Sequence, residues 1–168
     1  MSLSHKAFEL DWADFERELG PILTRALASQ SAVELELFIK TNAHQCRDPA
    51  EGNPIEDDWI DLLGDIQALA DVALTKYYLP TEDFGLGEEW SKLDAGLSEI
   101  ARSALLGRAF ESGGIAFDPG LMGSYFQRPG EIARSRDLLK SSGVPQFAVF
   151  VGQLEQALDN GSGIYVCF

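Results

Sequence analysis

Four aspartates lie close together in the chain and are the first residues whose type and spacing could do chemistry: Asp57, Asp58, Asp61 and Asp65. Neighbouring carboxylates can act as general acid and base or bind a divalent cation. In a helix, Asp57, Asp61 and Asp65 would lie near one face, where like charges cost roughly a few tenths of a kcal/mol each. No Glu-x-x-His metal motif accompanies them. We interpret the row as a solvated face, with a surface for a protein partner as the alternative.

The sequence His44-Gln45-Cys46 could supply two metal ligands or a thiol–imidazole pair. The only other histidine is His5 and the only other cysteine is Cys167, so no second cluster completes a zinc site. The chain also lacks the Gly-x-Ser-x-Gly sequence of a serine hydrolase. We therefore predict no catalytic residue, no metal and no cofactor, and a non-enzymatic function is favoured.

An apolar stretch with five glycines and two prolines, residues 113–131, divides the helical part of the chain from its last third. Asp118-Pro119-Gly120 is typical of a type II turn, and no Gly-Lys-Ser/Thr follows the glycines, so this is not a phosphate loop. Burial of its apolar side chains is favourable by ~1.5 to 3 kcal/mol each, which predicts a loop packed under the helices. The alternative is a pocket whose candidate residues are Asp118, Ser124, Tyr125 and Arg128.

The net charge of −14 is concentrated in the middle of the chain. Residues 48–99 carry 14 Asp/Glu against 2 Lys/Arg, whereas residues 100–168 carry 6 of each. Such a field repels nucleic acid and anionic membranes, which bind proteins through Lys and Arg. It would attract a basic protein partner, and the candidate residues for that contact are Asp57, Asp58, Asp61, Asp65, Glu88 and Glu89. The alternative is that the charge serves solubility alone.

Length and composition indicate one globular domain over residues 1–168. No apolar run reaches the roughly 18 residues of a membrane span. The N-terminal residues are acidic and lack the apolar core of a signal peptide. Two isolated cysteines are typical of reduced thiols, so we expect a cytoplasmic protein.

Hydrophobic spacing predicts a short strand at 7–10 and then a series of helices. Asp11 is a candidate N-cap, and Pro21 suits the first position of the next helix. The segment 31–45 has both helical and alternating patterns, and the capping-box spacing from Ser31 to Glu34 favours a helix over a strand. The longest helix is predicted from 56 to 78, and another from 88 to 106.

After residue 128, helices are predicted at 129–142 and 145–160, with a strand at 147–151 as the alternative to the start of the second. Residues 164–168 have the pattern of a strand, whose expected partner is the strand at 7–10. The predicted fold is therefore α+β, predominantly helical, with a small sheet that includes the C-terminal strand.

A small acidic chain without a catalytic motif is similar in composition to many bacterial immunity-type proteins, although no motif and no residue carries the resemblance. The leading hypothesis is a non-enzymatic interaction protein that binds a basic partner such as a toxin domain. The second is a small-molecule-binding protein or enzyme with a pocket beside 113–131. A homodimer formed through that apolar stretch is a third.

Overall fold

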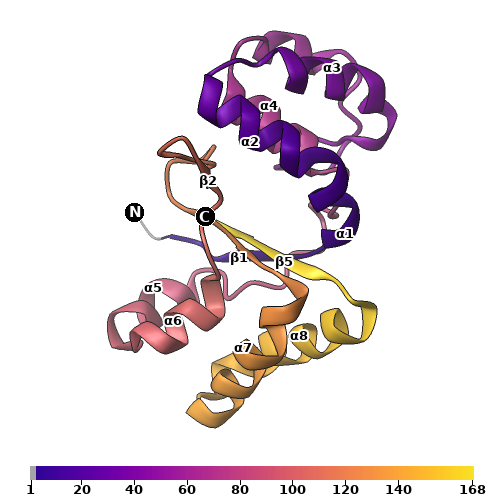
Figure 1. Cartoon of the computed structure of the whole chain (residues 1–168). Coiled ribbons are helices and arrows are strands. Elements are labelled where there is room, and N and C mark those ends of the chain that lie inside the picture. The colour runs from indigo at the N-terminus through magenta and orange to yellow at the C-terminus, as the bar shows by residue number, and fades with distance from the viewer. Residues whose placement is uncertain (1–2) are drawn as a thin grey trace.

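A three-stranded antiparallel sheet lies between two layers of helices in the computed structural model, which describes residues 3–168 (Figure 1). The strands are β1 (Lys6–Leu10), β4 (Ser124–Gln127) and β5 (Gly163–Cys167), in the order β1-β5-β4. The C-terminal strand is thus the central one. The predicted α+β class, with helices predominating and a small sheet that includes the C-terminal strand, is confirmed.

Both faces of the sheet are buried, and alternate residues of each strand face different layers. Phe8 and Tyr165 pack into the core formed with α1–α4, whereas Ala7, Ile164 and Val166 pack into the core formed with α5–α8. The predicted pairing of the N-terminal and C-terminal strands is confirmed, with Phe8 opposite Tyr165.

The first helical layer comes from the N-terminal half and lies above the sheet in Figure 1. It contains α1 (Trp12–Asp14), the π-helix η1 (Phe15–Leu19), α2 (Gly20–Ser29), α3 (Val33–Asn42), the 3-10 helices η2 (Ala43–Gln45) and η3 (Asp58–Leu62), and α4 (Ile66–Leu74). Asp11 caps α1, as predicted. The segment 31–45 is helical because Leu35, Phe38 and Ile39 face the core together at helical spacing.

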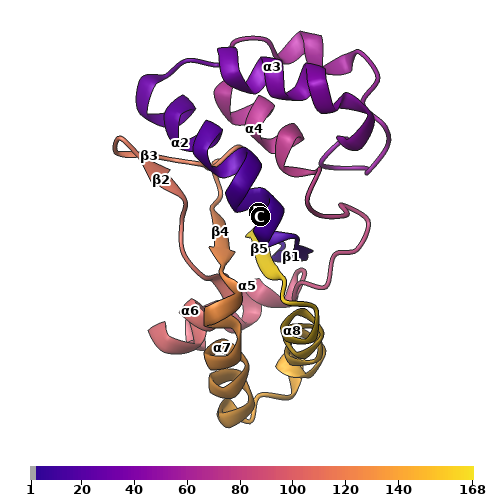
Figure 2. The same cartoon turned by 45° about the vertical axis from the view of Figure 1, so that its right-hand side comes forward.

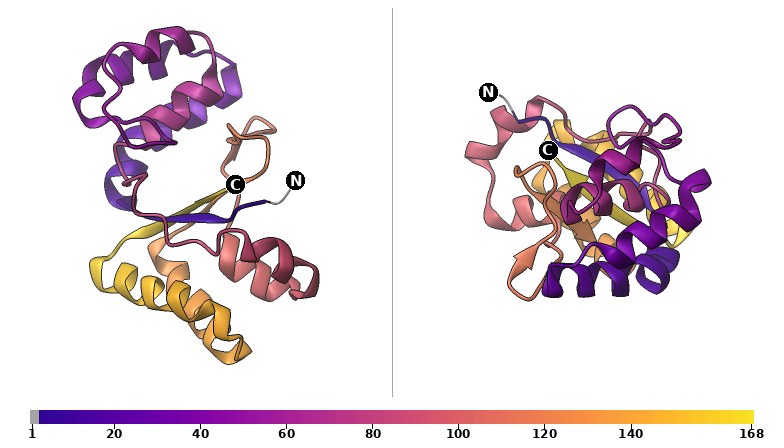
Figure 3. Two further views of the ribbon diagram at one scale, coloured as in Figure 1. Left: turned by 180° about the vertical axis from the view of Figure 1, so that it is seen from behind. Right: turned by 90° about the horizontal axis from the view of Figure 1, so that it is seen from above.

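The second helical layer covers the opposite face of the sheet, as the view from behind in Figure 3 shows. It contains α5 (Glu89–Leu93), α6 (Glu99–Leu106), α7 (Pro129–Ser142) and α8 (Ala148–Asn160), with the 3-10 helices η4 (Asp94–Gly96) and η5 (Pro145–Phe147). The prediction that Pro129 begins a helix is confirmed, and 147–151 does not form a strand.

The two long helices predicted at 56–78 and 88–106 are wrong, because each is interrupted by a new helix start. Gly64 has a φ of +85° between η3 and α4, and the Asp65 side chain then caps α4 by accepting from the N–H of Ala68 at 3.0 Å. Ser98 is extended and caps α6 in the same way, through the N–H of Ala101. Both breaks combine a turn with an N-cap residue.

The prediction that 113–131 is an irregular loop is also wrong. Gly113 and Gly114, both at positive φ, form the two-residue turn of a hairpin between β2 (Glu111–Ser112) and β3 (Ile115–Ala116). The stretch then supplies β4 to the main sheet, as Figure 2 shows. The turn at Asp118 is not type II, since the positive φ lies at Leu121 (+58°) rather than at Gly120.

Other chain segments cover both edges of the main sheet. They therefore prevent the pairing with strands of other chains that an open edge allows. The outer edge of β1 bonds to residues 83–87, where Phe84 donates to Ala7 and Gly87 donates to His5, each at 2.9 Å. The outer edge of β4 is covered by Arg108, which exchanges two backbone hydrogen bonds with Phe126. Within residues 3–168, no helix is long and apolar enough to span a bilayer.

Candidate functional site

Three of the aspartates predicted as a partner surface lie exposed in and beside η3. Asp57, Asp58 and Asp61 make no ion pair within the described residues. Ile60 and Leu63, in the same turn, are 48% and 52% exposed. We call these five residues, Asp57, Asp58, Ile60, Asp61 and Leu63, the η3 surface. The η3 surface thus combines exposed apolar side chains with exposed carboxylates.

Other acidic candidates have local structural roles. Asp65 caps α4, and Glu89 forms an ion pair with Lys92 on α5. Glu88 occupies the N-cap position of α5 without a side-chain cap bond. The structure therefore explains Asp65 and Glu89 by helix capping and ion pairing. Glu88 and the aspartates of the η3 surface make no ion pair within residues 3–168.

The acidic candidates do not form one face, because the sheet separates them (Figure 1). The η3 surface belongs to the first helical layer, next to α4, whereas Glu88 and Glu89 begin α5 in the second layer. The expected face shared by the helices at 56–78 and 88–106 is thus two separate acidic regions.

The four pocket candidates of 113–131 do not converge on one cavity. Asp118 is held in its turn, where its N–H donates to Gln67 at 2.8 Å and its carboxylate accepts from Gly123 at 3.0 Å. Ser124 and Tyr125 are in β4 and face opposite sides of the sheet. The guanidinium of Arg128 lies over the ring of Trp12, 5.7 Å from its centroid. These contacts are structural.

The apolar residues of the stretch are packed only in part. Phe117 and Phe126 are buried in the first core, as predicted. Leu121 and Met122 are 85% and 44% exposed, so the prediction that they pack under the helices is wrong. Leu121 ends a tight turn and Met122 follows it, and the N–H of Leu121 closes this turn by donating to the carbonyl of Asp118 at 3.2 Å.

A hollow of about 420 Å³ lies between α6 and α7, at the C-terminal end of 113–131. Gln127 of β4 lines it together with polar and apolar side chains of both helices, among them Ser103, Ile100, Arg134 and Leu138. None of the predicted pocket residues takes part. No sequence signal distinguishes Gln127, because β4 also contains the polar residue Ser124.

A second hollow, of about 600 Å³, lies where the first helical layer meets the ends of β1 and β5. Glu9, Asp11 and Glu82 line it, opposite Arg47 and Lys76. The carboxylate of Glu9 accepts hydrogen bonds from Asn160 at 2.7 Å and Ser162 at 2.8 Å. These hydrogen bonds connect β1 to the turn between α8 and β5, so the carboxylate of Glu9 has a structural role.

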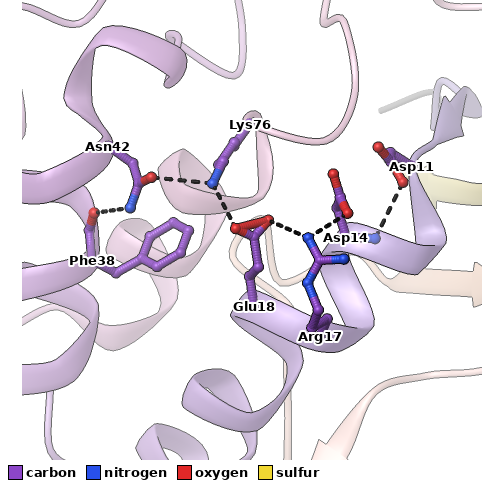
Figure 4. Close-up of polar contacts among 7 residues, drawn as sticks. All are labelled: Asp11, Asp14, Arg17, Glu18, Phe38, Asn42 and Lys76. Atoms are coloured by element: carbon purple, nitrogen blue, oxygen red, sulfur yellow. Dashed lines mark hydrogen bonds and ion pairs between the residues drawn. The ribbon is translucent and has the colours of Figure 1, made fainter.

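Lys76 anchors the polar network beside this second hollow (Figure 4). Its ammonium donates to Glu18 of η1 at 3.0 Å and to Asn42 of α3 at 3.1 Å. It also lies over the rings of Phe38 and Tyr77, 5.5 Å from each centroid. One cation thus joins η1 and α3 to the end of α4, which is a structural role for one of the two basic residues in 48–99.

The histidines and cysteines are not brought together. His44 is exposed, while Cys46 is buried, and burial raises the pKa of the Cys46 thiol to about 11, which suits an inert core thiol. His5 is fully buried on the far side of the sheet, stacked on Trp90. No group of three or more His, Cys, Asp or Glu within residues 3–168 is arranged to hold a metal ion.

No protein-family model, curated protein or solved structure gives a significant match to this chain.

Proposed function

We propose that this chain is a non-enzymatic interaction protein that binds a basic protein partner through the η3 surface. The observation that carries the proposal is the grouping of three aspartates, which make no ion pair in the described part of the chain, around exposed Ile60 and Leu63. An interface of this kind gains affinity from its apolar centre, while the charged rim sets the association rate and the choice of partner.

Two features support the η3 surface over the other acidic region. Glu56, next to it, is exposed and has a φ of +39°, a conformation that is strained for a non-glycine residue and common beside functional surfaces. The backbone on its other side is fixed, since the N–H of Gly64 donates to Glu36 of α3 at 3.1 Å. The carboxylates are therefore presented on an anchored segment.

The specific form of the proposal is an immunity-like role in the cytoplasm, in which the partner is a basic toxin domain. The high net negative charge of the chain supports it, because it would steer such a partner over long range. A partner with a neutral or acidic binding face would gain nothing from this field.

The test begins with identification of the partner by capture on the immobilised chain from the source cells, followed by association kinetics with the purified partner. Combined reversal of Asp57, Asp58 and Asp61 to Lys should slow association by about tenfold or more at about 50 mM salt, and much less at about 500 mM. Ile60→Ser should mainly speed dissociation, because it removes apolar contact rather than charge.

The matched control reverses Glu16, Glu111 and Asp159, which are exposed and make no ion pair within the described residues. It changes the net charge by the same amount but leaves the η3 surface intact. Equal slowing by both triple variants would mean that only net charge matters, and unchanged rates in both would reject the acidic-surface proposal.

A further inference from the structure

The hollow between α6 and α7 has the size and lining of a small-molecule site. Its volume of about 420 Å³ lies within the range of known ligand pockets, roughly 300 to 1,000 Å³. Ile100, Ala104 and Leu138 give it an apolar wall, and Ser103 and Ser135 add hydroxyl groups. Ile100 is 61% exposed, although a large aliphatic side chain gains from being covered.

Gln127 contributes a buried polar atom without a partner. The side chain is 1% exposed, and its Nε2 donates to the carbonyl of Ala104 at 2.8 Å. Because a carbonyl can only accept, this bond fixes the orientation of the amide. The Oε1 atom is then left with no hydrogen bond among residues 3–168. Such an atom costs roughly 1 to 3 kcal/mol unless a donor reaches it.

The charged groups around the hollow are of both signs. Arg134 makes no ion pair among the described residues, and Gly130 is at the second position of α7, where the backbone N–H has no acceptor inside the helix. Arg108 and Glu131 pair with each other at 3.1 Å, and Glu99, at the start of α6, is exposed and also lines the hollow. An anionic group is therefore favoured beside Gly130 and Arg134, and a cationic group beside Glu99.

We propose that this hollow binds an amino acid whose large apolar side chain carries an N–H or O–H donor. The carboxylate would lie against Arg134 and the N–H of Gly130, and the ammonium against Glu99. The side chain would cover Ile100 and Leu138 and direct its donor toward Gln127, whose buried Oε1 becomes accessible once the side chains over it shift on binding. This inference does not depend on the partner proposed for the η3 surface, which lies on the other side of the sheet.

The test is a titration of the ¹⁵N-labelled full-length chain with L-tryptophan, followed by NMR. A ligand of this size bound at low efficiency should have a dissociation constant of about 1 mM. The shifts should be confined to the amides of Ser103, Gly107 and Gly130 and to the side-chain amide of Gln127. No shifts at these positions up to about 10 mM ligand would overturn the proposal.

Three related probes separate the recognised groups. L-phenylalanine lacks the donor and tryptamine lacks the carboxylate, so each should bind about tenfold more weakly. N-acetyl-L-tryptophan lacks the ammonium and stands for the C-terminal residue of a peptide. If it binds more tightly than L-tryptophan, the ligand is a peptide terminus and the assignment to a free amino acid is wrong.

Substitutions on the exposed surface test the site without touching the core. Arg134→Ala should weaken L-tryptophan binding about tenfold, whereas Arg136→Ala, which removes the same charge from α7 outside the hollow, should not. Ser103→Leu places a side chain in the hollow and should abolish the shifts while the rest of the spectrum is unchanged. Equal binding by Arg134→Ala and Arg136→Ala, or binding that survives Ser103→Leu, would reject the site.

Discussion

The buried His5 and the half-buried Asp71 lie on opposite sides of the sheet and have pKa values that burial shifts in opposite directions. Burial lowers the pKa of His5 to about 4, and its Nδ1 accepts from the N–H of Leu86 at 3.0 Å. Burial raises the pKa of Asp71 on α4 to about 7, and the nearby Asp48 carboxylate adds to the shift. Both residues therefore prefer to be neutral in the folded chain.

These shifts give stability opposite dependences on pH. The folded-state pKa of His5 is below its unfolded value of 6.5, so its contribution is present above pH 6.5 and is lost as the pH falls toward 4. The folded-state pKa of Asp71 is above its unfolded value of 3.8, so stability is lost as the pH rises from 3.8 toward 7. The two contributions oppose each other over the same range.

We predict that Asp71→Asn stabilises the protein at pH 8 but not at pH 4. The variant removes the cost of holding a buried carboxylate charged, and each unit of pKa shift corresponds to about 1.4 kcal/mol. Because Asp71 is partly exposed, we expect a gain in the free energy of unfolding of about 2 kcal/mol at pH 8, measured by urea denaturation.

The matched control is Asp159→Asn, which removes the same charge from the exposed end of α8. The difference between each variant and the wild-type chain cancels the other titrating groups, His5 included. A gain from Asp71→Asn that is equal at both pH values would show that burial does not shift its pKa.

At the scale of elements, α6 and β4 meet at a point where only glycine fits. Gly107 ends α6 with a φ of +90°, and a Cβ atom there would lie 2.3 Å from the carbonyl oxygen of Phe126. This approach allows Arg108 to exchange backbone hydrogen bonds of 2.9 and 2.8 Å with Phe126. It also sets the spacing of α6 and β4 beside the hollow.

Gly107→Ala should therefore destabilise the chain by about 3 kcal/mol or more, since it combines a strained φ with a backbone clash. Gly96→Ala in η4, where a Cβ would meet nothing within 4 Å, should change stability by less than about 1 kcal/mol. Thermal and urea unfolding would measure both. Similar losses in the two variants would show that the α6–β4 contact does not depend on glycine.

The sequence predicts elements whose signal is local and misses those set by distant contacts. The strand at the C-terminus follows from a short apolar run after Gly161-Ser162-Gly163. The break at Gly64 is hidden, because Leu62, Ile66 and Leu69 pack against the same core on both sides of it. The strand β4 has only four residues and is defined by its pairing with β5, from Ser124 opposite Cys167 to Gln127 opposite Ile164, far along the chain.

The candidate sites likewise divide into features that the local sequence predicts and features that depend on distant contacts. Exposure of Asp57, Asp58 and Asp61 is predictable from their polarity and position. Whether Asp65 is free or caps a helix depends on where that helix starts, which the periodicity of the apolar residues does not show. The hollow at Gln127 depends on a contact between β4 and α6, so the sequence indicates only its neighbourhood, through Arg128.

At the scale of the whole molecule, the two cores share one sheet of three short strands. On β1, Phe8 lines the first core and Ala7 the second; on β5, Tyr165 lines the first core, and Ile164 and Val166 line the second. If either layer of helices unfolded alone, it would expose one face of β5, whose residues Ile164, Tyr165 and Val166 are at most 1% exposed. That cost couples the two layers.

We therefore predict that the two layers unfold as one cooperative unit. The chain has three tryptophans. Trp12 belongs to the first core, Trp59 packs against it, and Trp90 belongs to the second, so ¹⁹F NMR of the chain labelled with 5-fluorotryptophan reports on both layers. The Trp12 and Trp90 resonances should lose intensity at the same urea concentration. The side chain of Val166 packs in the second core. Val166→Ala should lower the free energy of unfolding by roughly 2 kcal/mol and lower the urea midpoints of the Trp12 and Trp90 resonances equally. Separate midpoints, or a shift of the Trp90 resonance alone, would show that the chain is two folding units joined by the sheet.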